Sequence, residues 1–198
     1  TASIKSFFHH PQMQAKLEVQ DFQFEEGDMG TLYAEANYND KEGKINIDAY
    51  ADAGEGSRTD INGYVDIKKS YINLPIFANN TNLYFLKSFC GSFMDKIQVQ
   101  GNGWCKVVGP LSAINLEGDV QVHGSVYVKP IGVTYKMRDV RVRIIPNEII
   151  FANDTITDPQ GHIGIVTGGL HHKNLSHLTY DINILARNLL AYNFPKKQ

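Results

Sequence analysis

Short runs that alternate apolar and polar residues fill the chain between Gly101 and Ala186, and glycine-bearing turns separate them. In one run Val120 and Val122 share a face, while Gln121 and His123 point the other way. This period of two is that of a β-strand, in which successive side chains lie on opposite faces of a sheet. A long sheet with one apolar face must place that face against something, so the pattern raises the question of what covers it.

The same pattern begins near the N-terminus. Residues 13–24 predict a strand whose apolar frame shifts partway, which indicates a β-bulge near Gln20. Residues 31–38 and 44–52 predict a hairpin, because Asn39, Asp40 and Gly43 between them are residues that tight turns favour. In the second arm of this hairpin, Ile45, Ile47, Ala49 and Ala51 share one face and Asn46, Asp48, Tyr50 and Asp52 the other.

Further strands are expected along the rest of the chain, at residues 61–67, 71–77, 97–108, 111–117, 120–128, 133–137, 140–145, 149–151, 162–170 and 178–185. The exception is residues 82–89, where Leu83, Leu86 and Phe89 fall at helical spacing. We expect one or two helical turns there, capped by Thr81 or Asn82, that plug an open end or groove of the sheet. Short connections favour antiparallel neighbours.

These elements predict an all-β fold: an antiparallel meander curled into an open β-roll or taco-like folded sheet, with one short helix near residues 82–89. The length of 198 residues and a 42% hydrophobic content fit a single β domain over residues 1–198. The abrupt start at Thr1 suggests a fragment of a longer protein.

Charge and hydropathy argue against several classes of partner. A net charge of -2 without a long basic run argues against a nucleic-acid partner and, more weakly, against an anionic membrane surface. No apolar stretch reaches the roughly 18 to 20 residues that a membrane-spanning helix needs. We therefore expect no membrane span and no nucleic-acid partner.

No residues form a convincing catalytic, cofactor or metal site, so we predict that the chain is not an enzyme. Adjacent histidines such as His9–His10 and His171–His172 would point to opposite faces of a strand and chelate one ion poorly. Gly101 and Gly103 lack the Lys-Ser/Thr and the helix of a phosphate loop. Asp154 and Asp158 are expected in turns rather than as a catalytic pair. Cys90 and Cys105 could form a disulfide or remain two buried thiols, and the sequence leaves both options open.

Several segments resemble the AsmA-like, TamB-type translocation and assembly proteins of Gram-negative bacteria, especially the long Bacteroidetes forms. They span about half the chain and consist of residues 80–86 with Phe89, 103–111, 116–119, 134–135, 145–151, Asp158 with Gly161, 169–172 and 181–190. Residues 154–156 also look like the acceptor motif of Bacteroidetes O-glycosylation. The first 50 residues match the family only in style.

The resemblance implies a periplasmic fragment, near the C-terminal part, of an inner-membrane-anchored cell-envelope protein. Such proteins look like elongated folded-over sheets whose apolar groove conducts phospholipid between the inner and outer membranes and supports outer-membrane biogenesis. They are also thought to assist protein assembly and secretion with an Omp85-type outer-membrane barrel protein. The partners expected here are therefore phospholipid and such a barrel protein.

We expect one apolar stripe to line the groove: Val120, Val122, Val126, Val128, Val140, Val142, Ile144, Ile163, Ile165, Ile182 and Ile184. The same residues could instead form the core of a closed sandwich or roll. A second functional hypothesis is a protein-interaction module that pairs an exposed sheet edge with a client or barrel strand. A carbohydrate-binding domain is less favoured, because Tyr50, Tyr64, Trp104 and Tyr127 are scattered along the sequence.

Overall fold

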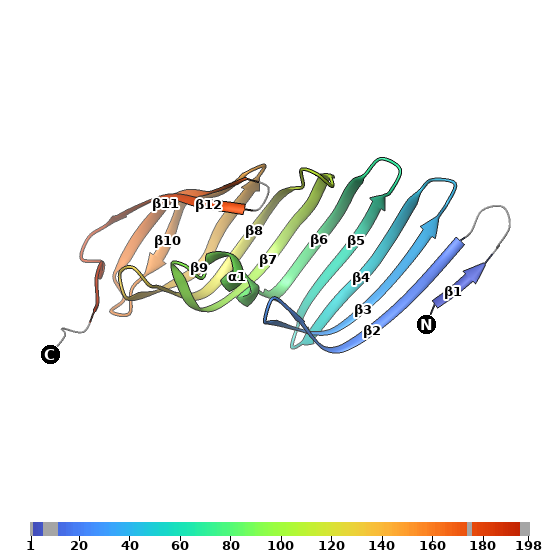
Figure 1. The fold of residues 1–198 in the computed structure, drawn as a ribbon. Coiled ribbons are helices and arrows are strands. Elements are labelled where there is room, and N and C mark those ends of the chain that lie inside the picture. Colours follow the sequence, from blue (N-terminus) through green and yellow to red (C-terminus); the bar gives the residue numbers. More distant parts are fainter. Residues whose placement is uncertain (1, 6–11, 174–175, 195–198) are drawn as a thin grey trace.

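A computed structural model describes residues 2–5, 12–173 and 176–194, and over these residues the chain forms one 12-stranded antiparallel sheet. The strands follow one another in chain order from β1 to β12, so each pairs with its neighbours in sequence (Figure 1). This order needs only short connections, which is why a chain of alternating runs and tight turns adopts it.

The strands are long. Their bounds are β1 Ala2–Lys5, β2 Gln12–Phe24, β3 Gly27–Asn39, β4 Lys44–Gly54, β5 Ser57–Asp66, β6 Tyr71–Asn82, β7 Met94–Pro110, β8 Asn115–Val128, β9 Val133–Ile145, β10 Glu148–Thr157, β11 Ile163–Lys173 and β12 Ser176–Ala186. Between β6 and β7 lie a short 3₁₀ turn, η1 Tyr84–Leu86, and one turn of α-helix, α1 Lys87–Cys90.

The predicted all-β antiparallel meander, its openness and its single short helical segment are confirmed. The predicted curling into a roll or taco is not found, because the sheet as a whole is uncurled, and β1 and β12 are its two edge strands. The runs at 111–117 and 120–128 largely merge into β8, and those at 133–137 and 140–145 merge into β9.

β-Bulges explain why some long strands look interrupted in the sequence. Val140 of β9 pairs with Val122 and Met137 pairs with Gly124, so β9 has one extra residue at this point, and Asp139 takes a positive φ of 54°. The frame shift predicted near Gln20 is confirmed in β2, where the register changes between Val19 and Phe22. Apolar side chains therefore stay on one face although their sequence spacing changes.

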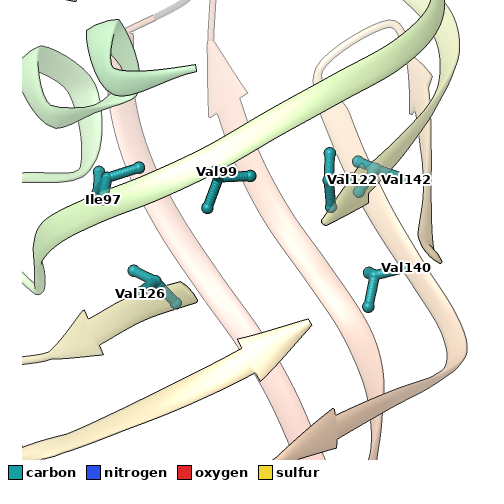
Figure 2. Packing of buried hydrophobic residues seen from close by; sticks show 6 residues of the cluster. All are labelled: Ile97, Val99, Val122, Val126, Val140 and Val142. Carbon is teal, nitrogen blue, oxygen red and sulfur yellow. The ribbon is translucent and has the colours of Figure 1, made fainter. Parts of the chain in front are cut away.

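The buried side chains form two clusters. The central core consists of Ile97, Val99, Val122, Val126, Val140 and Val142, from β7, β8 and β9 (Figure 2). The C-terminal core consists of Val133, Tyr135, Ile156 and Val166, from β9, β10 and β11. Both clusters lie toward the C-terminal end of the sheet, and within the described ranges neither draws a residue from β2–β6.

The segment from Leu83 through α1, which we call the plug, covers the central core. Leu83, Tyr84 and Leu86 pack against that cluster, and the Leu83 backbone N–H donates to the Val99 carbonyl at 2.9 Å. A Cβ on Gly101 would lie 3.0 Å from Leu83 Cδ1, so this glycine makes room for the plug. The predicted cap by Thr81 or Asn82 is wrong, because the N-cap of η1 is Leu83, without a side-chain hydrogen bond. Asn82 Oδ1 accepts from the Tyr84 N–H at 3.0 Å at the start of this turn.

The plug is also held from the N-terminal side. The ring centroids of Phe85 and Phe24 are 5.4 Å apart in an edge-to-face arrangement. The tip of the β2–β3 hairpin reaches the plug in the same region, since a Cβ on Gly27 would lie 3.0 Å from the Phe85 backbone nitrogen. The predicted plugging role of residues 82–89 thus has a physical counterpart over the start of β7.

Candidate functional site: the apolar face of the sheet

Strand register gathers apolar side chains on one side of the whole sheet, which we call the apolar face. One row across neighbouring strands runs through Leu17, Ala34, Ala49, Ile61, Ile76 and Cys105. A second row runs through Val19, Leu32, Ala51, Thr59, Ala78, Gly103, Val120 and Val142. Directly paired residues lie on the same side of an antiparallel sheet, so these rows form one continuous surface.

The opposite, polar face carries cross-strand ion pairs. Lys16 Nζ lies 3.0 Å from Glu35 Oε2, and Arg141 pairs with Asp119 at 2.7 Å. The Arg141 guanidinium, which donates hydrogen bonds to this carboxylate, lowers the pKa of Asp119 and outweighs the effect of partial burial. This face is suited to water, which leaves the apolar face as the side that requires a partner.

Strand pairing brings some aromatic side chains on the polar face next to one another. Tyr50 stacks on Tyr33 with ring centroids 4.9 Å apart, and the Arg58 guanidinium lies 3.8 Å from the centre of the Tyr50 ring. Phe77 pairs with Trp104 on the neighbouring strand, and both are exposed. The sequence spacing gave no sign of these pairs, because their partners come from different strands.

Cover over the apolar face is uneven. The plug and the two cores close it over β7–β11, whereas Leu17 and Met13 in β2 remain 55% and 49% exposed. On β4–β6, apolar-face residues such as Ile47, Ile61 and Ile76 are only half-buried. The open part of the face, β2–β6, is the candidate functional surface.

The floor of this open part is low in its centre. Ala34 and Ala36 on β3 pair with Ala49 and Ile47 on β4, and Ile47 pairs in turn with Gly63 on β5. Larger apolar side chains stand on either side, from β2 and from β5 and β6. This part of the face therefore has small side chains in its centre and larger apolar side chains beside them.

A second cover lies at the C-terminal end, where residues 187–194, which we call the strap, follow β12. Leu189 and Leu190 pack against the C-terminal core. The Leu190 N–H donates to Asp158 Oδ2 at 2.8 Å, and the Tyr135 hydroxyl donates to the Leu190 carbonyl at 2.8 Å. The Asn193 N–H donates to the Ile131 carbonyl at 2.8 Å. The strap is therefore docked at three points.

Asp158 connects the strap to the β10–β11 turn and is 2% exposed. Besides Leu190, its carboxylate accepts from the backbone N–H groups of Gln160 and His162 and contacts His162 Nδ1 at 3.0 Å. Burial by itself would raise the pKa of Asp158, but these donors outweigh it and lower the pKa to about 2. The carboxylate is thus ionised and fully engaged.

Nine of the eleven predicted groove residues lie on the apolar face: Val120, Val122, Val126, Val128, Val140, Val142, Ile144, Ile182 and Ile184. Val122, Val126, Val140 and Val142 are buried in the central core, in the manner of a closed core. Ile163 and Ile165 were placed on the wrong face. Their neighbours Gly164 and Val166 are buried and point to the apolar face, so both isoleucines face the polar side, 58% and 39% exposed.

Sequence reasoning missed the open surface on β2–β6, although its signal was present. The alternation of Ile45, Ile47, Ala49 and Ala51 was visible, but alanines contribute little hydrophobic signal. The groove was therefore assigned to the valine-rich C-terminal strands, where the structure places the cores.

The structure shows the surroundings of each polar group that the sequence offered as a candidate site. Cys90 and Cys105 are both free thiols, and burial raises the pKa of each. Asp154 lies in β10 and not in a turn as expected: at a bulge, its Oδ1 accepts from the Arg141 N–H at 2.8 Å. His171 is exposed and His172 buried, as expected for neighbours on a strand; His9 and His10 lie outside the described residues. Within the part of the chain that is described, no group of three or more His, Cys, Asp or Glu side chains could hold a metal ion.

Two broader findings complete the description. None of the helical segments in the described ranges has the length and apolar character required to cross a membrane. No family model, curated protein or solved structure matches the chain.

Proposed function

We propose that the open apolar face of β2–β6 shelters the acyl chains of phospholipid, in a non-enzymatic segment of a TamB-type, AsmA-like envelope protein. In this proposal the protein acts in the periplasm and carries lipid between the inner and outer membranes. The observation that supports it is the apolar face of β2–β6, where Leu17 is exposed and Ile47 and Ile61 are half-buried, backed by a polar face.

The physical argument rests on the two faces. Moving a methylene group from water onto an apolar surface contributes about 0.8 kcal/mol when it is fully buried, so an acyl chain lying partly buried gains a share of this at each carbon. Ala49 and Ala51 in its centre are buried, so an acyl chain would contact the larger side chains beside them, such as Leu17 and Ile47. A headgroup could remain in water at the sheet edge while the chain lies on the face.

Neighbouring residues of β4 offer a matched test. Ile47 lies on the apolar face and Asn46 on the polar face. Ile47→Lys would place an ammonium group where the acyl chain lies, and desolvating it without a partner is costly. We expect phospholipid extracted from the purified variant and measured by mass spectrometry to fall by roughly tenfold.

Asn46→Lys adds the same charge to the same strand on the polar side and should leave the lipid content unchanged. A wild-type protein that contains no lipid and takes up none from phospholipid vesicles would contradict the proposal. So would an equal loss in both variants.

The alternative function is capture of a client strand or of an Omp85-type barrel protein by backbone pairing. It is favoured by the edges of the sheet, since β12 pairs only with β11 among the described strands. A protein free of lipid that still binds such a barrel would favour this alternative, because edge pairing does not require the apolar face.

A further inference from the structure

The surface beneath the strap is shaped to receive it. A Cβ on Gly164 would lie 2.9 Å from Leu189 Cδ2, and a Cβ on Gly132 would lie 2.6 Å from the Asn193 carbonyl oxygen. Gly132 also has a positive φ of 69°, which favours glycine there. Side chains at these two positions would push the strap off, so the strap occupies a defined seat on the sheet.

The central attachment of the strap is made through one residue, Leu190, and we call its two hydrogen bonds the clip. Both backbone polar groups of Leu190 are held by side chains: Asp158 accepts from its N–H, and Tyr135 donates to its carbonyl. The two side chains come from separate elements, the β10–β11 turn and β9. The clip therefore fixes the strap to the sheet without adding it as a strand, and it acts together with the packing of Leu189 and Leu190 on the C-terminal core.

The strap does not fill the space above the sheet. An open hollow of about 410 Å³ lies beside it, lined by Ile131, Tyr135, Ile184, Ala186, Leu189 and Ala191, with Asn188 as a further polar member. Small-ligand sites commonly have this size and an apolar lining. None of the described residues that line it is charged.

We propose that the strap is a displaceable cover over a second alkyl-chain site on β9–β12, and that an entering chain takes the place of Leu189 and Leu190. The inference rests on the proposed function, because it extends the same apolar face beneath the strap. An alkyl chain fits the uncharged lining. Asp158 keeps its three contacts to Gln160 and His162 after Leu190 leaves, so release does not strand a buried charge.

Tyr135→Phe tests the cover, because it removes only the hydroxyl that holds the Leu190 carbonyl. In this variant of the 198-residue chain we expect faster hydrogen exchange over residues 187–194. We also expect roughly tenfold tighter binding of a fluorescent polyene fatty acid at this site, since less cover must be displaced. In the wild-type protein, saturating fatty acid should itself speed exchange in the strap.

Tyr127→Phe is the matched control, because Tyr127 pairs with Thr134 on the polar face, where Lys96 Nζ lies 5.5 Å from its ring centre. It should change neither strap exchange nor fatty-acid affinity. The same titration on Ile47→Lys reports binding on β2–β6 separately from binding beneath the strap.

The outcomes separate the two proposals. If the wild-type protein binds fatty acid on β2–β6 but Tyr135→Phe speeds strap exchange without a gain in binding, the cover is wrong and the proposed function stands. If no variant binds fatty acid, both fail. If Tyr135→Phe gains affinity only for a synthetic peptide corresponding to residues 188–192, the seat recognises an extended peptide and the alkyl assignment is wrong.

Discussion

At the scale of single residues, Asp158 combines a local and a distant role. The sequence predicted a turn from Asp158 to Gly161, and this is confirmed, since the Gly161 N–H donates to the Asp158 carbonyl at 3.1 Å. The bond from Leu190, 32 residues further along the chain, was not predictable, because nothing in the local sequence indicates which distant N–H a buried carboxylate will accept from.

The pKa of Asp158 has a measurable consequence for stability. Its folded-state pKa of about 2 lies below the ordinary value of about 3.9, so its contribution is present above pH 4 and is lost as the pH falls through about 2. We expect Asp158→Asn to lower the melting temperature at neutral pH by a few degrees. The fall in wild-type stability between about pH 4 and pH 2 should also become shallower in the variant.

Thermal unfolding followed by circular dichroism across this pH range would check the prediction. Asp48→Asn is the control, because Asp48 is exposed on the polar face, where its Oδ1 accepts from Asn62. Identical pH profiles for Asp158→Asn and wild type would show that the turn and strap do not depend on this carboxylate.

At the scale of elements, the plug is the helical segment that packs on the central core. Its helical spacing was readable, because Leu83, Leu86 and Phe89 depart from the period of two. Leu83 and Leu86 pack against the central core, whereas Phe89 is 47% exposed. The sequence therefore indicated the type of element but not which of its side chains face the sheet.

Leu83→Ala should measure what the plug contributes. Truncating a leucine that packs on a core removes buried apolar contacts and leaves a cavity, so we expect a loss of about 1–3 kcal/mol in the free energy of unfolding, less than for a fully buried leucine. Leu111→Ala, the same change at an exposed position in the turn after β7, should cost much less. Urea unfolding of both variants checks this, and equal losses would mean that the plug is not packed as described.

Strand β11 explains why two groove residues were assigned to the wrong face. Its apolar-face positions alternate between Gly164, Val166, Gly168 and Leu170, and glycine carries no hydrophobic signal. The outward Ile163 and Ile165 therefore dominate the pattern of the sequence. The period of two shows that side chains alternate between the two faces of a strand. Where glycines on the apolar face make room for a covering segment, however, the apolar residues visible in the sequence lie on the opposite face.

At the scale of the whole molecule, the sheet joins a covered half to an open half. The strand order could be predicted, because short turns between alternating runs leave few other topologies. The difference between the halves could not, because the same alternation fits a closed core and an open face. What decides it is the plug and the strap, whose contacts join residues far apart in the chain.

This division predicts two levels of local stability. Backbone amides in β8 and β9, beneath the plug, should exchange with solvent at least roughly tenfold more slowly than those in β3 and β4, because opening the covered half exposes far more buried apolar surface. Hydrogen exchange followed by mass spectrometry would measure this, and adding phospholipid should raise protection in β3 and β4 specifically.

Uniform exchange across the sheet would mean that it opens as one cooperative unit. Lipid-induced protection confined to β8 and β9 would place the acyl chains against the covered half and overturn their assignment to β2–β6.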